Sequence, residues 1–251
     1  MVHSSMVPRP YSGVMGKAVL EVAVLAPGDV PGADEGGADR LHLGTAAGLS
    51  PEPSAVSAVC RESDLPVFVQ LRLTDSWTTT GGELTRLTGL AEDFLSCGAA
   101  GVSFGFLDAD LGIDTEVCRH LAESLPGVPW TFHRAFDDAL EPERAWARVA
   151  DLPGLVGVHS AGSPRGLDVG YEDLLALATR WPKIAEHVVP AGGLLGEHVP
   201  WFVRVGVRTF QVGQQVRPGG SEKAYVDAAH VRSWRLLLDD AVTRAEHAVA
   251  G

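Results

Sequence analysis

The sequence predicts a single (β/α)8 barrel, the TIM-barrel fold. Short apolar runs typical of buried parallel strands alternate with longer segments of helical periodicity, and this alternation occurs eight times along the chain. The length of 251 residues is close to the roughly 250 residues typical of this fold. A doubly wound sheet is the alternative, but no GxGxxG motif follows the first apolar run, which disfavours a dinucleotide-binding fold of that kind.

Eight apolar runs predict the strands of the barrel. Each is short, is rich in aliphatic or aromatic residues and ends near glycine, proline or a polar group, as buried strands do. The predicted strands span residues 20–24, 40–43, 67–73, 101–107, 129–135, 155–160, 187–193 and 209–214.

The segments between these runs predict helices. Ser50 is a candidate cap with Pro51 at the first helical position, and Asp114 is expected to cap a later helix. Segment 27–39 contains two prolines and four glycines, so we expect a short or broken helix there. The other predicted helices span residues 50–63, 83–98, 114–125, 141–152, 170–181, 197–206 and 227–249.

Composition restricts the partners and the compartment. The formal net charge of −12 disfavours nucleic acid and anionic membrane surfaces, and no apolar run is long enough to span a membrane. Residues 1–17 lack the pattern of a signal peptide and are expected to form a flexible leader before a barrel domain at 18–251. Cys60, Cys97 and Cys118 are few, odd in number and without CxxC spacing, so we expect a reduced, cytoplasmic protein.

Polar residues recur on the strand faces expected to point into the barrel. Side chains alternate between the lumen and the helix layer, and the chemistry of TIM barrels lies at the C-terminal strand ends. Five polar side chains alternate with apolar neighbours on five different strands, and such a cluster predicts a functional site at one end of the barrel. They are Glu21, His42, Arg72, His133 and Gln211.

The segment TFHRAFD (131–137) holds further candidate residues. His133 is expected to point into the lumen and Arg134, with the opposite parity, to anchor the rim. Asp137 follows the strand, where it could either orient His133 or pair with Arg134.

Glycine-rich turns follow the last two strands. Gly192 and Gly193 end the seventh strand and Gly213 ends the eighth. TIM barrels commonly bind phosphate at these positions with backbone N–H groups, so the three glycines are candidates for an anion site.

Several motifs together resemble the CutC family of copper-homeostasis proteins. The resemblance extends from about Leu20 to about Gly213 and includes LEVAV (20–24), EGGADRLHL (35–43), TFHRAFD (131–137), HSAGSPRG (159–166) and VPAGGL (189–194). It implies a TIM barrel, a role in copper tolerance and the binding of copper as Cu(I).

The chain departs from the family pattern where copper ligands would be expected. Ala23 and Gly44 stand where the family often has cysteine, Leu25 replaces an aspartate, His42 replaces a glutamate, and Gln211 replaces a histidine. Because Cu(I) prefers thiolate and thioether ligands, the remaining candidates for a metal are the imidazoles of His42 and His133.

Three functions are therefore open. The first is a CutC-like role in copper homeostasis, with copper or another metal ion bound. The second is an isomerase- or lyase-type enzyme for a small phosphorylated or carboxylated metabolite, with His133 as general acid or base. In that enzyme Glu21 could act as the counter-base, and Arg72 could hold the anion. The third is an inert scaffold that acts through partners, and a homo-oligomer is compatible with all three.

Overall fold

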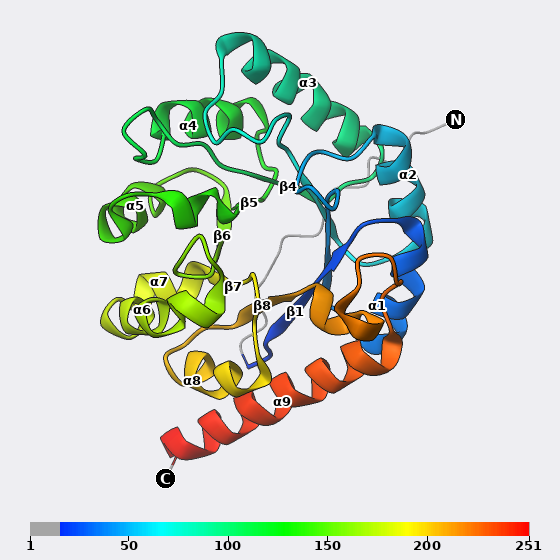
Figure 1. The fold of residues 1–251 in the computed structure, drawn as a ribbon, viewed down its shortest axis with the longest axis vertical. Helices are drawn as coiled ribbons and strands as arrows, with labels where there is room; N and C mark the ends of the chain where they lie inside the picture. Colours follow the sequence, from blue (N-terminus) through cyan, green and yellow to red (C-terminus); the bar gives the residue numbers. More distant parts are fainter. Residues whose placement is uncertain (1–15, 251) are drawn as a thin grey trace.

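A computed structural model describes residues 16–250 of the chain, without the side chains of 249 and 250. Eight parallel strands form one sheet with the order β7-β6-β5-β4-β3-β2-β1-β8, and the end strands β7 and β8 contact each other to form a nearly closed barrel. The helices surround the strands, as Figure 1 shows in a view close to the barrel axis. The predicted TIM barrel is confirmed.

The strands are short, three to six residues each. They are β1 (Val19–Val24), β2 (Arg40–Leu43), β3 (Val67–Gln70), β4 (Gly101–Phe104), β5 (Trp130–Phe132), β6 (Leu155–Ser160), β7 (Val188–Pro190) and β8 (Thr209–Val212). Each of the eight predicted runs overlaps one strand, but the runs overestimate the C-terminal ends of β3, β4, β5, β7 and β8.

In the described part of the chain, nine α-helices form the outer layer. They are α1 (Val30–Gly36), α2 (Pro53–Glu62), α3 (Gly81–Ser96), α4 (Thr115–Ser124), α5 (Pro142–Val149), α6 (Leu167–Arg180), α7 (Pro182–His187), α8 (Val199–Arg204) and α9 (Ala228–Ala250). Short 3-10 turns complete the described chain: η1 (Pro27–Asp29), η2 (Arg134–Asp138), η3 (Gly196–His198), η4 (Gln214–Val216) and η5 (Pro218–Gly220). The long α9 packs against α1 and α8 and also contacts β1 (Figure 1).

The predicted N-terminal cap is present at one helix and absent at another. Asp114 caps α4 by accepting a hydrogen bond from the Val117 N–H, as predicted. Ser50 does not cap α2, which begins at Pro53. The Ser50 hydroxyl instead accepts the N–H of Arg72 at 2.8 Å, because the segment before α2 crosses the end of β3. Segment 27–39 forms η1 and the short α1, as expected for its prolines and glycines.

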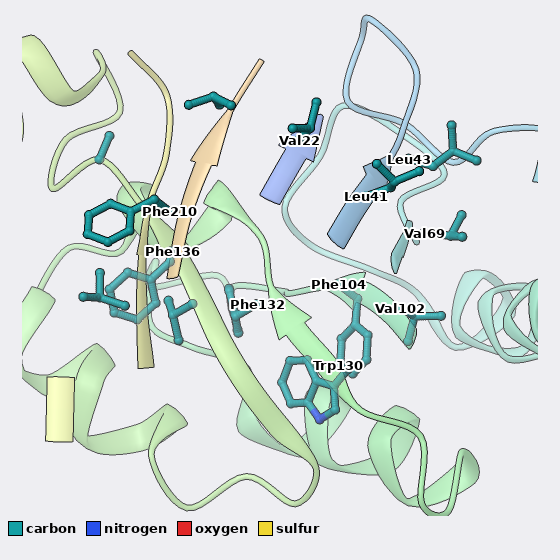
Figure 2. Close-up of a cluster of buried hydrophobic side chains, with 14 of the residues drawn as sticks. Val22, Leu41, Leu43, Val69, Val102, Phe104, Trp130, Phe132, Phe136 and Phe210 are labelled. Carbon is teal, nitrogen blue, oxygen red and sulfur yellow. The ribbon is translucent and has the colours of Figure 1, made fainter. Parts of the chain in front are cut away.

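The hydrophobic core lies between the barrel and its helices. Strand side chains that point outward from the barrel are fully buried against the helices (Figure 2). They include Val22, Leu41, Val69, Val102 and Phe132. Every second residue on these strands therefore faces the helices, and the residues between them are directed into the lumen. Among the described residues, no helix combines the length and apolar character needed to cross a membrane.

Of the expected leader, residues 1–15 lie outside the described part of the chain. Lys17 is described, and its ammonium group pairs with Asp39 at 2.7 Å.

Candidate functional site

Glu21 is the centre of the polar cluster in the lumen. Its carboxylate accepts hydrogen bonds from His159 Nε2 at 2.6 Å and from Gln211 Nε2 at 2.8 Å, and it pairs with Arg40. These partners come from β6, β8 and β2, and β6 lies across the barrel from β1. Glu21 can reach His159 only through the lumen, so the inward direction predicted for Glu21 and Gln211 is correct.

The charge of Arg40 decides the ionisation of Glu21. Burial alone would raise the pKa of this carboxyl, but the Arg40 guanidinium and the contacts with His159 outweigh burial and hold the pKa well below its usual range. Glu21 is fully buried and Arg40 is 1% exposed. The pair is therefore a carboxylate and a guanidinium that neutralise each other inside the barrel.

Arg40 and His159 are two site residues that the predicted set lacks. Both follow the alternation that identified the others, since Arg40 precedes His42 by two positions and His159 follows the outward-facing Val158. The sequence therefore contained a signal for both residues in the parity of their strands.

His42 completes a group of three possible metal ligands. Its Nδ1 atom lies 3.7 Å from Glu21 Oε1, and its Nε2 lies 3.2 Å from Gln70 Oε1. One ligand atom from each of Glu21, His42 and His159 lies within 4.8 Å of the other two. Burial lowers the pKa of His42 to about 4 despite the attraction of Glu21, so the imidazole is neutral at physiological pH, as a metal ligand must be.

His133, the other predicted imidazole ligand, stands apart from this group. Its Nδ1 accepts the N–H of Ala135 at 3.1 Å, and its buried Nε2 has no hydrogen-bond partner. The capping contact with Ala135 also ends β5 and starts η2, which is why the predicted strand at 129–135 is shorter in the structure. Burial and the nearby charge of Arg72 lower the pKa of His133 to about 3.

Arg72 lies at the mouth of the lumen beside His133. Its guanidinium carbon lies 3.8 Å from the ring centroid of Trp77, and the Trp77 ring lies 5.3 Å from that of His133. The Arg72 side chain is 10% exposed, and its Nε is buried without a hydrogen-bond partner. Thus Trp77 covers two of the predicted site residues.

A cavity of about 230 Å³ opens at this C-terminal end of the barrel. Its walls include His42, Arg72, His133 and His159, so it connects the metal-ligand group with the Arg72–His133 pair. Such a position is where TIM barrels place their chemistry.

Arg134 and Asp137 lie on the rim outside this lumen cluster and bind each other. Arg134 Nε donates to Asp137 Oδ2 at 2.8 Å. The Asp137 carboxylate also accepts the Ser160 hydroxyl at 2.7 Å and the Ala161 N–H at 3.0 Å. Of the two roles expected for Asp137, the structure contains the ion pair with Arg134. Burial raises the pKa of Asp137, although Ser160 and Arg134 act against it.

The predicted anion-site glycines lie in different surroundings. The Gly213 N–H donates to Gln215 Oε1 at 2.9 Å, and the Gly192 carbonyl accepts the Leu167 N–H at 2.9 Å. Gly192 and Gly193 both have positive φ, of 78° and 103°, which glycine adopts at little cost. Their role in anion binding stays a prediction.

Replacing Gly192 with alanine is expected to lower the free energy of unfolding by about 1–2 kcal/mol. The new Cβ would lie 2.4 Å from Arg134 Nη1 at a φ of +78°, so the guanidinium would have to move from its place beside Asp137. Urea denaturation measures the loss. Gly81→Ala is the control, because its Cβ would meet no atom within 4 Å. Equal losses in the two variants would contradict the packing argument.

Comparison with known proteins places the chain in a family. The sequence profile of the CutC family matches residues 18–212. A human protein named copper homeostasis protein cutC homolog is 30% identical over 198 residues, which cover 75% of this chain and 70% of the human one. A CutC family protein of Sinorhizobium medicae is 28% identical over 249 residues, covering 92% of this chain and all of the relative. The match to a Drosophila melanogaster cutC homolog, at 34% identity, spans only 47% of each chain.

Solved structures agree on the fold. The CutC structure from Streptococcus agalactiae superposes with a TM-score of 0.69 at 18% identity, covering 78% of this chain and 98% of that one. Thiamine phosphate pyrophosphorylase from Pyrococcus furiosus gives 0.53 at 20% identity, over 92% and 98%. At these identities the likeness concerns the fold alone. The family profile, which matches most of the chain, shows that this chain belongs to the CutC family.

Proposed function

We propose that the chain acts in copper homeostasis by binding a transition-metal ion in the barrel lumen. The observation that supports this function is the convergence of Glu21, His42 and His159, whose ligand atoms lie within 4.8 Å of one another. Two imidazoles and a carboxylate are donors that suit a borderline divalent ion. The names of the curated relatives supply the link to copper.

The donor set fits Cu(II) or Zn(II) better than Cu(I). Ala23 and Gly44, where the family often has cysteine, line the same cavity without a thiol. The described thiols lie elsewhere, on or beside helices α2, α3 and α4. Burial raises the pKa of the Cys60 thiol to about 11 and that of Cys118 to about 12, so neither offers a thiolate at neutral pH.

The residues of the group would hold the ion through atoms that are available in the lumen. His42 Nδ1 is buried and has no hydrogen-bond partner. His159 Nε2 now contacts Glu21, while its Nδ1 has no partner and could carry the proton that Nε2 gives up. Arg40 beside Glu21 opposes a cation by charge repulsion, which favours moderate affinity and exchange over permanent retention.

Purified chain is expected to bind one Cu(II) or Zn(II) ion, and His159→Gln is expected to weaken binding by at least about tenfold. Calorimetric titration and elemental analysis after dialysis measure the affinity and the stoichiometry. His3, which lies outside the described residues, is replaced by glutamine in every chain so that it supplies no imidazole. His230→Gln, which changes a half-exposed histidine of α9, is the matched control. Absence of stoichiometric binding, or equal affinities in the two variants, would refute the metal site.

A second candidate function is catalysis on a small phosphorylated or carboxylated metabolite, as an isomerase or lyase. The specific observation in its favour is the charge of the cavity, because Arg72 and Arg134 line it and no carboxylate is among its lining residues. His133, the predicted general acid or base, would act through Nε2, since Nδ1 is occupied by the Ala135 N–H. In the neutral ring, the Nε2–H would donate a hydrogen bond to the substrate oxygen on which charge develops. Turnover of candidate metabolites that is lost in His133→Leu would support this function. Its absence across phosphorylated and carboxylated compounds would exclude it.

We also propose a cytoplasmic location, supported by three free cysteines in the described chain. A homo-oligomer is a further proposal, to be tested by light scattering. The Trp201 side chain on α8, 53% exposed, is a candidate contact for it.

A further inference from the structure

We propose that Arg72 and His133 form a binding site for a small oxyanion, a carboxylate or phosphate group, at the mouth of the barrel. This proposal rests on the second candidate function, because only that function makes the bound ligand a substrate. It does not depend on a bound metal ion.

The first step of the argument is the tautomer of His133. The Ala135 N–H donates to Nδ1 at 3.1 Å, so Nδ1 presents its lone pair and the proton of the neutral ring is on Nε2. The imidazole therefore offers an N–H donor at Nε2, which has no hydrogen-bond partner although His133 is only 4% exposed. In this tautomer Nε2 cannot ligate a metal, and it suits an acceptor oxygen.

The second step is the matching donor on Arg72. Its Nε–H is likewise buried and without a hydrogen-bond partner, and the residue is 8% exposed. Buried donors in folded proteins are nearly always satisfied. Two unsatisfied donors at the ends of β3 and β5, the strands on either side of β4, both belong to residues that line one cavity. They indicate that an acceptor belongs there.

The third step is the position of Trp77. Its ring packs on the guanidinium face of Arg72, at 3.8 Å, and lies 5.3 Å from the ring of His133. Stacking holds a guanidinium by its face and leaves the N–H groups at its edge to donate. In Arg72, Nη2 donates to the Asp75 carbonyl, and Nε remains for a ligand. Trp77 also shields both donors from water, which strengthens hydrogen bonds to a charged oxygen.

The last step is the charge and size of the ligand. The cavity walls contain Arg72 and Arg134 and no carboxylate, and the Glu21 carboxylate in the lumen is paired with Arg40. Arg72 and Arg134 have carboxylate partners outside the cavity, Asp75 at 3.9 Å and Asp137 at 2.8 Å. Within the cavity walls, only cationic and neutral groups face a ligand, which favours an anion over a cation. About 230 Å³ of space suits a small metabolite.

Inorganic phosphate and acetate are the probes for the two kinds of oxyanion, a phosphate and a carboxylate group. In metal-free buffer of constant ionic strength, the full chain is expected to bind at least one of them saturably with one site per chain. Arg72→Gln is expected to weaken that binding by at least about tenfold, because a charge-assisted hydrogen bond is lost. His133→Leu is expected to weaken it by about fivefold or more. His133→Gln, which keeps an N–H donor near the position of Nε2, is expected to stay within about threefold of the wild type.

Arg204→Gln is the matched control, because Arg204 also lies over a tryptophan, at 4.9 Å from the Trp201 ring, but on the outer surface of α8. It is expected to bind the probes like the wild type. Should Arg72→Gln fail to fold, nitrogen-resolved NMR of the wild type decides, since a bound anion must shift the Arg72 Nε–H and the His133 ring signals.

Unchanged signals on both groups, no saturable binding of either probe, or equal affinities in Arg72→Gln and Arg204→Gln would overturn the proposal. Binding without turnover of any metabolite would leave this site intact and remove the enzymatic function. Because the titration contains no metal, its outcome is independent of the metal measurement.

Discussion

Replacing Asp29 with asparagine is expected to lower the free energy of unfolding by about 3–5 kcal/mol. Asp29 and Arg217 form a buried, two-pronged ion pair with N–O distances of 2.9 and 2.7 Å, and their side chains are 1% and 3% exposed. The same carboxylate accepts the N–H groups of Leu25 at 2.7 Å and Val226 at 3.0 Å. Asparagine would leave a buried guanidinium without its counter-charge and would point an amide donor toward backbone donors.

Urea denaturation at pH 7.5 measures this loss against two references. Asp240→Asn breaks an exposed pair on α9, with side chains 79% and 54% exposed, and is expected to cost less than about 1 kcal/mol. The double variant Asp29→Leu with Arg217→Met removes both charges and is expected to recover part of the loss. Recovery is incomplete because the N–H groups of Leu25 and Val226 lose their acceptor. If Asp29→Asn lowered the free energy of unfolding no more than Asp240→Asn, the pair would not stabilise the contact between the loop after β1 and the loop after β8.

The Asp29–Arg217 pair also marks the limit of prediction from the sequence. Alternation along each strand identifies the face on which a side chain lies, and it predicted the inward direction of Glu21 and Gln211. It cannot identify contacts between residues 188 positions apart, because these depend on how the sheet closes and on where the loops cross the rim.

The same reasoning applies to the lumen cluster. The contact between Glu21 and His159 crosses the barrel, so it follows from closure and strand register and not from local periodicity. His42 and His133 share a parity and were both predicted as metal ligands, but only His42 belongs to the group with Glu21. The Ala135 N–H, a local backbone contact that strand periodicity does not predict, engages one ring nitrogen of His133.

Acidification from pH 7.5 to pH 5 is expected to destabilise the protein by about 2 kcal/mol for each of His42 and His133. Burial lowers their pKa values to about 4 and about 3, from an ordinary value of 6.5. Between pH 6.5 and pH 5 the unfolded chain therefore takes up protons that the folded chain excludes, so stability falls as the pH falls. Glu21, whose pKa is lowered in the folded state, loses its stabilising effect only below about pH 4.5.

Replacing either His42 or His133 with glutamine tests its lowered pKa separately from that of the other. Urea denaturation of the wild type, His42→Gln, His133→Gln and the control His230→Gln at several pH values gives four curves of stability against pH. Each lumen variant is expected to lose about 2 kcal/mol of the drop between pH 7.5 and pH 5. Differences between variant and wild type cancel the contributions of other groups, such as Asp137. A lumen variant with the same slope as the wild type would show that its histidine is not held neutral, and the neutral donor proposed at His133 would then lose its support.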